Sequence, residues 1–434
     1  MIGRDKEGPG TMPLNRDDWK RDICRAVDAL GPRLVEHSHG IHADPEIAFN
    51  EHHASARLAD ELEEQGFQVS RGIGGLPTAF RADLQGQEPG PTIAILAEYD
   101  ALPEIGHACG HNVIATSALG AGLALARTAG ADFAGRISVI GTPAEEGGGG
   151  KIILAEAGVF SDVDVAIMMH PSTRNIVMRG SLAHSRIEIV FHGKAAHAAG
   201  SPDKGINALE AVIQTFVGVN GHRLHMRGDA RVHGIITHGG DAVNIIPARA
   251  AAKFSVRARS RSYQRELVEM VRSAAEGAGR MTGARLEWTE LRGYDNMVPN
   301  PTVGALCAAN MESLGLEVVV PSPNERMGST DMGDISQILP AIHAYFAVAS
   351  DGIPGHSVEF AAAAISEMAD GAVLYAAKSL AMTAADLLAD HDLVKDARQE
   401  FSEMLAQGKV AGFAAWQESG RGMVTDQTHR PTSA

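Results

Sequence analysis

The stretch Ala97-Glu-Tyr-Asp-Ala-Leu-Pro-Glu-Ile-Gly-His-Ala-Cys-Gly-His111 decides how this chain folds. The apolar run over residues 92–96 leads into it and has the composition of a buried strand. Pro103 and Gly106 then require a turn. A helix is expected from Asn112, because asparagine is a residue type that caps helix N-termini. A strand followed by a loop and a helix is the unit of α/β folds, which place their binding residues at the carboxyl ends of strands.

Four segments that each follow an expected strand carry side chains of the kinds that bind metal ions. In chain order these side chains are Asp100, Cys109 and His111, then Glu145 and Glu146, then His170, and finally His356. Taken alone, a histidine is more often a core or surface residue than a ligand, and adjacent glutamates usually face solvent. Together they fall where an α/β sheet opens its binding crevice, so the sequence predicts a shared metal site.

The alternation of strands and helices indicates a sheet that is covered by helices. Before residue 184 we expect helices over 16–38, 51–65 and 151–157, another helix after the quoted stretch, and strands over 79–84, 92–96, 136–140 and from Val165. After residue 300 we expect a strand over 342–348 and one long alanine-rich helix from Phe360 to about Leu388. This rhythm is typical of a parallel or mixed sheet.

The segment from residue 184 to residue 299 has a different rhythm. Its expected order is strand, helix, strand, strand, helix, strand, which is the βαββαβ order of a ferredoxin-like unit. We therefore predict an α/β fold in which a discontinuous domain over 16–183 and 300–417 contains the mixed sheet and the metal site, and a ferredoxin-like domain over 184–299 is inserted into it. Residues 1–15 and 418–434 are expected to be loose tails.

Composition narrows the class of partner and the compartment. The formal net charge of −15 argues against nucleic acid as a partner, because binding nucleic acid needs a basic surface. The three cysteines, Cys24, Cys109 and Cys307, are too few for a disulfide framework and favour a reducing compartment. No apolar run approaches the length that crosses a bilayer, and the N-terminus lacks the pattern of a signal peptide. We expect a cytoplasmic protein without a membrane or nucleic-acid partner.

The pair Glu145 and Glu146 suits a division of labour at a metal site. One carboxylate can bind the metal while the other moves the proton of a water molecule. The four glycines that follow, residues 147–150, make the backbone permissive for close approach to a ligand.

Eight short motifs, in the expected order, make the chain resemble the M20 metallopeptidase family. They are Asp100-Ala-Leu-Pro, His107-Ala-Cys-Gly-His-Asn, Pro143-Ala-Glu-Glu-Gly, His170-Pro, Lys194-Ala-Ala-His-Ala, Gly239-Gly-Asp-Ala-Val-Asn-Ile-Ile-Pro, Ser329-Thr-Asp-Met-Gly and Gly355-His. Within the family the chain is most similar to the amidohydrolase branch, subfamily D. In that branch it resembles the aminobenzoyl-glutamate hydrolase group, in which an asparagine, here Asn112, follows the motif histidine.

The resemblance implies a set of ligands for divalent ions: Cys109 as a thiolate, His111, Glu146, His170 and His356. Glu145 would be the general base and later the proton donor to the leaving amine, and Asp100 would orient a ligand imidazole. Mn²⁺ is the expected ion, with Zn²⁺ as the alternative, at one or two ions per subunit. Most members of the family have a histidine two residues before the aspartate of the first motif. This chain has Glu98 there, so ligation at that position depends on Cys109.

The resemblance further implies a homodimer that forms through the inserted domain, which would also act as a lid. His197, on that domain, would reach across the interface and stabilise the oxyanion in the partner's site. Asn244 would lie near the polar end of a small-molecule substrate. His107 matches its motif but is expected to be structural, because the family does not use it as a ligand.

These residues predict a metal-dependent hydrolase of a C–N bond, namely an amide that joins a small aromatic or acyl group to an amino acid. A hydroxide that bridges the ions would attack the amide, with Glu145 as general base. A hydrolytic deaminase of an activated aromatic amine would use the same residues. Two other interpretations are an inactive binding or scaffold protein of this fold, and a thiol enzyme with Cys109 as nucleophile. The thiol enzyme leaves both glutamates and two of the histidines without a role.

Overall fold

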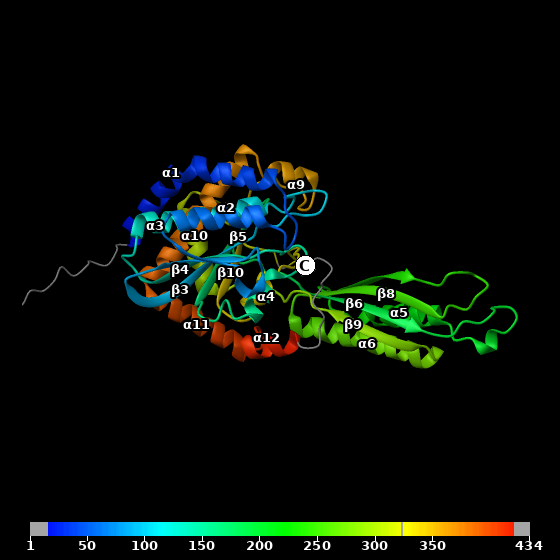
Figure 1. The fold of residues 1–434 in the computed structure, drawn as a ribbon. Coiled ribbons are helices and arrows are strands. Elements are labelled where there is room, and N and C mark those ends of the chain that lie inside the picture. Colours follow the sequence, from blue (N-terminus) through cyan, green and yellow to red (C-terminus); the bar gives the residue numbers. More distant parts are fainter. Residues whose placement is uncertain (1–15, 323, 421–434) are drawn as a thin grey trace, which may run out of the picture.

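The computed structural model describes residues 16–322 and 324–420, which form two lobes (Figure 1). The larger lobe contains a six-stranded sheet that lies between helices. The smaller lobe is elongated and contains a four-stranded sheet with two helices packed against it. The chain is therefore an α/β protein with a mixed sheet and a separate antiparallel sheet, as the sequence predicts.

The six-stranded sheet is mixed, and its parallel strands position the candidate site. Its strands are β1 (Gln68–Arg71), β2 (Phe80–Gln85), β3 (Glu88–Ala97), β4 (Ala134–Gly141), β5 (Val165–Ser172) and β10 (Ala341–Ala347). The order is β1-β2-β4-β3-β5-β10, and β3, β4, β5 and β10 are parallel to one another. Because parallel strands end at the same edge of a sheet, the loops that follow these four strands meet there.

Helices cover both faces of this sheet and bury it in two apolar clusters. One cluster contains residues from α1 (Arg16–Ala43), α2 (His52–Glu64), α3 (His111–Ala129), α7 (Pro301–Ser313), α10 (Glu367–Ala389) and α11 (His391–Ala406). The other contains residues from α4 (Gly150–Glu156), α8 (Met332–Ser336) and α12 (Phe413–Gly420). Burial of these apolar faces is the main term that stabilises the lobe, and it fixes the strand ends in space.

The long helix expected from Phe360 is two helices, α9 (Val358–Ala363) and α10. Ser366 interrupts the run, since its hydroxyl accepts a hydrogen bond from the amide of Ala369 and caps α10. By length and composition α10 could cross a membrane, so the expectation that no segment has that length is wrong. Its most apolar window is 78 % buried inside the lobe, which is the behaviour of a core helix.

Helix α3 begins one residue before the expected position, and Asn112 is not its cap. The residue before the helix is Gly110, whose φ of 76° is left-handed. A side chain there would also clash, because a Cβ atom would lie 2.7 Å from Cγ of Pro171. Asn112 is buried, and its amide donates to the hydroxyl of Ser38 at 2.9 Å and to the carbonyl of Ala364 at 3.0 Å. It therefore ties α3 to α1 and to the turn before α10.

The smaller lobe has the predicted βαββαβ order. Its elements are β6 (Ala183–His192), α5 (Ala208–His222), β7 (Arg231–His238), β8 (Arg249–Ala258), α6 (Arg261–Thr282) and β9 (Arg285–Leu291). All neighbours in the sheet order β7-β8-β6-β9 are antiparallel, so β7 and β9 are the edge strands. The smaller lobe also contains the short 3₁₀ helices η2 (Pro202–Lys204) and η3 (Arg223–His225), and another, η1 (Ile73–Gly75), lies between β1 and β2 in the larger lobe.

The boundaries that we place at 183/184 and 299/300 stay predictions. Residues 1–15 and 421–434, which include most of the two predicted tails, lie outside the described residues. Residues 418–420 belong to the second predicted tail, yet they complete helix α12. That part of the tail prediction is therefore wrong, and the reason is that Trp416 buries its ring and anchors the helix.

Candidate metal centre

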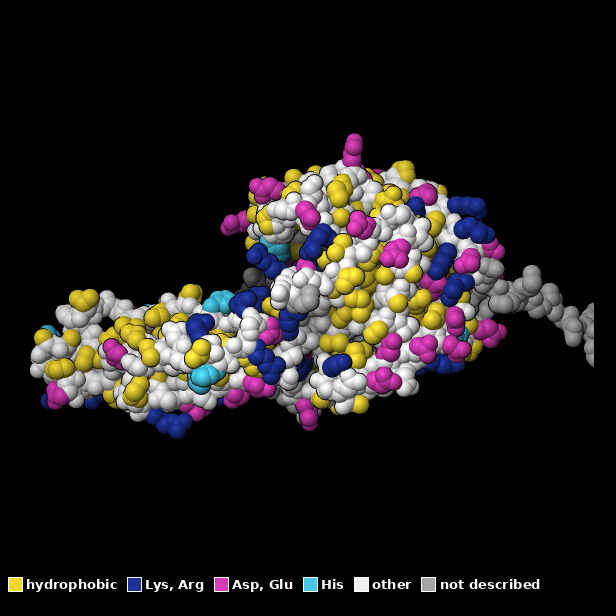
Figure 2. Space-filling model, turned by 180° about the vertical axis from the view of Figure 1, so that it is seen from behind, with side chains coloured by type: hydrophobic (Ala, Val, Ile, Leu, Met, Phe, Trp, Pro, Cys, Tyr) yellow, Lys and Arg dark blue, Asp and Glu magenta, His cyan; other side chains and the backbone are white. Residues whose placement is uncertain are grey.

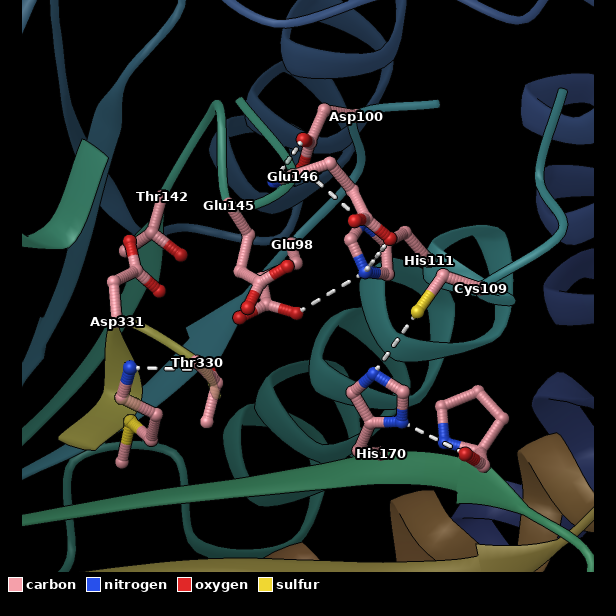
Figure 3. A network of polar contacts seen from close by, with 12 residues as sticks. Glu98, Asp100, Cys109, His111, Thr142, Glu145, Glu146, His170, Thr330 and Asp331 are labelled. Atoms are coloured by element: carbon pink, nitrogen blue, oxygen red, sulfur yellow. Dashed lines mark hydrogen bonds and ion pairs between the residues drawn. The ribbon is translucent and has the colours of Figure 1, made fainter. Parts of the chain in front are cut away.

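The segments that carry the predicted ligands all follow strands that end at one edge of the six-stranded sheet. Residues 98–111 follow β3, residues 142–149 follow β4, His170 lies near the end of β5, and the loop with His356 follows β10. Figure 3 shows the side chains of Glu146, His111, Cys109 and His170 pointing toward one another in this region.

The first group of possible ligands is Cys109, His111 and His170. One donor atom from each lies within 4.8 Å of the others. The Sγ atom of Cys109 lies 3.5 Å from Nε2 of His170, and the two imidazole rings meet edge to face with centroids 5.9 Å apart. A thiolate and two imidazoles are a donor set that suits a divalent transition-metal ion.

The second group is Cys109, Glu146 and His356, whose donor atoms also lie within 4.8 Å of one another. Nε2 of His356 lies 3.1 Å from Oε1 of Glu146. His356 has a φ of 60°, a left-handed conformation that is rare outside glycine and is often found at functional sites. Cys109 belongs to both groups, so its thiolate would help to hold an ion with His111 and His170 and an ion with Glu146 and His356.

Two neighbouring groups turn the imidazoles toward the centre. Oδ1 of Asp100 lies 3.1 Å from Nδ1 of His111, and the carbonyl oxygen of Pro171 lies 2.7 Å from Nδ1 of His170. Each Nδ1 therefore carries the proton, which leaves Nε2 as the atom that can bind a metal. Asp100 uses its second oxygen to accept a hydrogen bond from the amide of Glu146 at 2.9 Å, so it orients two candidate ligands at once.

Buried polar atoms without a well-directed hydrogen bond test whether these residues fit a metal. Nε2 of His111 and Oε1 of Glu146 are buried and make no such bond among the described residues, yet Oε2 of Glu98 lies 3.5 Å from the first and Nε2 of His356 lies 3.1 Å from the second. Polar atoms that face one another this closely without good hydrogen-bond geometry suit a cation placed between them. Burial lowers the pKa of His170 to about 4 and keeps it neutral, as a ligand must be. Burial, together with the charge of Glu146, raises the pKa of the Cys109 thiol well above its usual range, so a thiolate there needs a cation beside it.

Glu145 is buried next to the ligands and faces other acidic groups. Its carboxylate lies within 4.8 Å of those of Glu98 and Asp331, and Figure 3 shows the three side by side. Burial, and then the charges of Glu98, Glu146 and Asp331, raise the pKa of Glu145 well above its usual range. The ammonium of Lys151 lies 2.5 Å from Glu98 and 2.7 Å from Asp331, and it compensates part of this negative charge. The position suits a group that takes up and returns a proton.

The backbone before Glu145 is held by Glu51, a residue that no motif identifies. Ala144 has a φ of 63°, and its amide donates to Oε1 of Glu51 at 2.8 Å. The other oxygen of Glu51 accepts a hydrogen bond from the hydroxyl of Thr78 at 2.9 Å. Burial, and the charge of Asp100, raise the pKa of Glu51 to about 8. A buried acid beyond the motif thus fixes the unusual turn that presents Glu145.

The glycine run after Glu146 has a packing role that the sequence did not predict. A Cβ atom on Gly150 would lie 1.8 Å from the carbonyl oxygen of Pro143, and one on Gly148 would lie 2.3 Å from the ring of Phe49. These two glycines allow the loop to pack against its own chain, and Gly147 lines the cavity described below, so close approach of the run to a ligand stays a prediction.

A cavity of about 680 Å³ opens above the ligands and reaches the smaller lobe. Its wall includes Cys109, Glu145, Glu146, His170 and His356, and also four arginines, Arg179, Arg186, Arg257 and Arg292. Arg186 and Arg257 come from β6 and β8, so the two lobes share the cavity. Figure 2 shows basic side chains gathered where the lobes join. The cavity is therefore basic except at the carboxylates beside the ligands.

Three residues that the motifs single out lie outside the ligand groups. His107 is buried, and neither of its ring nitrogens has a hydrogen-bond partner among the described residues. His197 and Asn244 are exposed on the smaller lobe and adjacent, because the amide of Ala198 donates to the carbonyl of Asn244 at 3.0 Å. Neither is among the described residues that line the cavity. Their roles stay predictions that need a second subunit.

Comparison with known proteins assigns the chain to a family. Residues 79–378, most of the chain, match the model of peptidase family M20/M25/M40. The Xaa-Arg dipeptidase of Mus musculus is 37 % identical over 411 residues, which cover 91 % of this chain and 95 % of that protein. A p-aminobenzoyl-glutamate hydrolase chain of Escherichia coli (strain K12) is 30 % identical over 459 residues, which cover 88 % of this chain and 95 % of that protein.

Solved structures share the fold. A putative aminohydrolase from methicillin-resistant Staphylococcus aureus has a TM-score of 0.75 at 20 % identity, over 85 % of this chain and all of that chain (100 %). A dinuclear metal-binding peptidase of the M20 family from Bacillus subtilis has a TM-score of 0.67 at 24 % identity, over 83 % and 99 % of the two chains. The chain is thus an enzyme, a metal-dependent hydrolase of amide or peptide C–N bonds, and it belongs to peptidase family M20/M25/M40.

Proposed function

We propose that the enzyme hydrolyses the amide bond between an acyl or aromatic acyl group and an amino acid, with Glu145 as general base. The observation that carries this proposal is the sharing of Cys109 by two ligand groups beside the buried carboxylate of Glu145. Ions held by these donors would polarise a carbonyl and lower the pKa of a water molecule. We propose two Mn²⁺ ions, with Zn²⁺ as the alternative that metal analysis would reveal.

The chain's own residues account for the proton transfers. Glu145 is ionised when a cation lies beside it, and it can then accept a proton from water. The same carboxyl group returns that proton to the leaving amine, which must be protonated to depart from the tetrahedral carbon. The burial of Glu145 keeps bulk water from competing for the proton.

The cavity favours a substrate that carries a carboxylate. Burial alone lowers the pKa of Arg257, and no carboxylate among the described residues forms an ion pair with it. The guanidinium of Arg179 lies over the ring of Tyr345, 4.6 Å from its centroid, and the buried Nε of this arginine has no partner among the described residues. Half-buried guanidinium groups without a counter-ion are suited to bind a substrate carboxylate. The names of both relatives above contain an amino acid, which agrees with this substrate class.

We also propose that two copies pair through the smaller lobe. Its edge strand β7 exposes Ile235 and Ile236, and helix α5, which packs on β8 and β6, exposes Ile213 and Val217. An edge strand with exposed apolar side chains is suited to pair with the same strand of a second copy. Figure 2 shows apolar side chains along this lobe. Such a dimer would give His197 and Asn244 a route to the partner's cavity.

The Glu145→Gln variant tests the reaction. It should keep its metal and lose turnover by a factor of about 10² to 10⁴, because the amide cannot accept the proton. Glu312→Gln, which changes an exposed glutamate on α7, is the matched control and should keep wild-type turnover. Unaltered turnover in Glu145→Gln would reject the proposal.

The products distinguish the amide reaction from the alternative that the sequence left open. A panel of aryl amides and aryl amines is incubated with the metal-loaded enzyme, and free amino acid and ammonia are both measured. Release of an amino acid supports the proposal. Release of ammonia alone would show a deaminase, and an inactive protein without bound metal after gentle purification would show a scaffold.

A further inference from the structure

The segment between β9 and α7 contacts the loop that carries the proposed base. The phenolic hydroxyl of Tyr294 donates a hydrogen bond to the backbone carbonyl of Glu145 at 2.5 Å. The ring of Tyr294 also packs on the glycine run, since a Cβ atom on Gly149 would lie 3.2 Å from its Cε1. A residue from the connection between the lobes thus holds the peptide unit of Glu145.

The backbone on both sides of Tyr294 is fixed. Its carbonyl accepts a hydrogen bond from the amide of His184 at 2.8 Å, so the connection is paired here with the start of β6. The amide of the next residue, Asp295, donates to Oδ2 of Asp334 at 3.0 Å. Asp334 lies in α8 and is almost completely buried, so the connection is anchored to the larger lobe.

The same carboxylate also anchors the C-terminal helix α12. Oδ1 of Asp334 accepts a hydrogen bond from the indole of Trp416 at 2.9 Å. The guanidinium of Arg292, at the start of the connection, lies over the Trp416 ring 4.5 Å from its centroid and 3.8 Å from Oδ1 of Asp334. Trp416 is fully buried. Its ring and its N–H therefore hold Arg292 and Asp334 together.

A second bridge joins the C-terminal segment to the connection. Gln337 accepts hydrogen bonds from the amide of Gly412 at 2.8 Å, through its backbone carbonyl, and from the amide of Ala411 at 3.1 Å, through its side chain. The side-chain amide of Gln337 donates to the carbonyl of Asn296 at 2.8 Å. Helix α12 is thus attached to the connection on both sides of Tyr294.

We propose that Tyr294 is a positioning residue for Glu145, and that helix α12 acts through it. The helix holds the connection at Asp334, the connection holds the Tyr294 hydroxyl, and this hydroxyl holds the Glu145 peptide, whose preceding residue has a left-handed backbone. This inference rests on the proposed role of Glu145 as base. It assigns to the C-terminal helix a role in turnover, although the described residues of the helix contribute no ligand and do not line the cavity.

The first test uses the Tyr294→Phe variant, which removes one hydroxyl and keeps the ring. We expect kcat to fall about tenfold while KM stays within about twofold and metal content is unchanged, because only the placement of the base is disturbed. Tyr375→Phe, on an exposed tyrosine of α10, is the control and should resemble the wild type. A rise in KM with unchanged kcat would overturn the proposal and would show that Tyr294 binds substrate.

The second test is a double-mutant cycle with Trp416→Phe, which removes the indole N–H and keeps an aromatic ring under Arg292. Alone, this variant should lower kcat in the same way but by a smaller factor. In the Tyr294→Phe background it should have no further effect, because the path from helix to base is already broken. An equal loss of kcat in both backgrounds would show that the helix acts by another route and would overturn its proposed role.

Hydrogen exchange separates this proposal from the proposed function, because it does not depend on turnover. Deuterium uptake by the peptide that covers residues 142–150 should rise in Tyr294→Phe and in Trp416→Phe, and not in Tyr375→Phe. Unchanged uptake would overturn the positioning role. Raised uptake with wild-type kcat would show that the contact holds the loop while Glu145 is not the base, which would overturn the proposed function.

Discussion

The two lobes use polar and apolar side chains in opposite ways. In the larger lobe, imidazoles and carboxylates converge on one point, and two of their buried atoms face other polar atoms without a well-directed hydrogen bond among the described residues. In the smaller lobe, apolar side chains are exposed on an edge strand and on a helix, with Val217 56 % and Ile235 65 % exposed. Donor atoms that converge inside a lobe favour bound ions, and apolar groups exposed on its surface favour a protein partner. The larger lobe therefore suits metal ions and the smaller lobe suits a protein partner, and the two hypotheses can be tested separately.

The largest effect is expected from Cys109→Ser, which removes the one residue shared by both ligand groups. A serine hydroxyl stays protonated and binds transition-metal ions poorly, so both ions should be lost or greatly weakened, with turnover reduced by about 10³ or more. Metal content of the purified protein is measured by mass spectrometry. Cys24→Ser changes a half-buried thiol on α1 and should keep both ions. If Cys109→Ser keeps two ions, Cys109 is not a shared metal ligand, and the proposed metal centre of the larger lobe is wrong.

A hybrid dimer tests the smaller lobe. We expect a dimer of one Glu145→Gln subunit and one His197→Ala subunit, purified with two tags, to have about half of the wild-type turnover, because one cavity then has both groups if His197 acts across the interface. A hybrid of wild type with the doubly substituted subunit should be inactive. If His197 acts within its own subunit, the two hybrids exchange these outcomes, and a monomer in sedimentation would contradict the dimer itself.

Arg257→Met tests the part of the cavity that the smaller lobe supplies. Removal of a half-buried guanidinium should raise KM about tenfold to a hundredfold for a substrate with a carboxylate, since a hydrogen bond to a charged group is lost, and should leave metal content unchanged. The effect should disappear with a substrate whose carboxylate is converted to a carboxamide. Arg285→Met, on the exposed edge strand β9, is the control. An equal effect on both substrates would show that Arg257 does not bind the carboxylate.

The difference between the lobes also explains what the sequence could predict. Candidate ligands such as His111 and His170 are chemically distinctive, and they lie in or after parallel strands that end at one edge of the sheet, so the sheet brings them together. No sequence motif identifies Glu51, Tyr294 or Trp416. They act on the site through hydrogen bonds to residues that are distant in the sequence, and only the folded structure reveals these bonds.

His197 and Asn244 show a second limit on prediction. Their motifs are plain in the sequence, but the roles proposed for them would depend on the surface of a second subunit, which one chain does not contain. The break between α9 and α10 is a third case, because the cap at Ser366 decides against the helical preference of an alanine-rich run. Pattern therefore predicts where side chains converge, and packing decides how they are held.

The smallest effect is expected at Glu51, a buried acid of the larger lobe that lies outside the groups of possible ligands among the described residues. The pKa of Glu51 rises from an ordinary value of 4.5 to about 8, chiefly by burial and then by the charge of Asp100. The folded protein thus keeps a proton between these values that the unfolded chain releases, so this group lowers stability as pH rises from about 5 to about 8. Glu51→Gln should remove that part of the pH dependence, and urea midpoints at pH 6 and pH 8 measure it.

Glutamine is a fair replacement for the protonated acid. Its carbonyl can accept the hydrogen bond from Ala144, and its amide can donate to the hydroxyl of Thr78, which then acts as acceptor. The stability that Glu51→Gln gains over the wild type should therefore be larger at pH 8 than at pH 6. Glu88→Gln, at the exposed start of β3, should keep the wild-type dependence. If Glu51→Gln loses stability with pH as steeply as the wild type does, Glu51 is ionised in the fold, and the turn before Glu145 is held by a carboxylate.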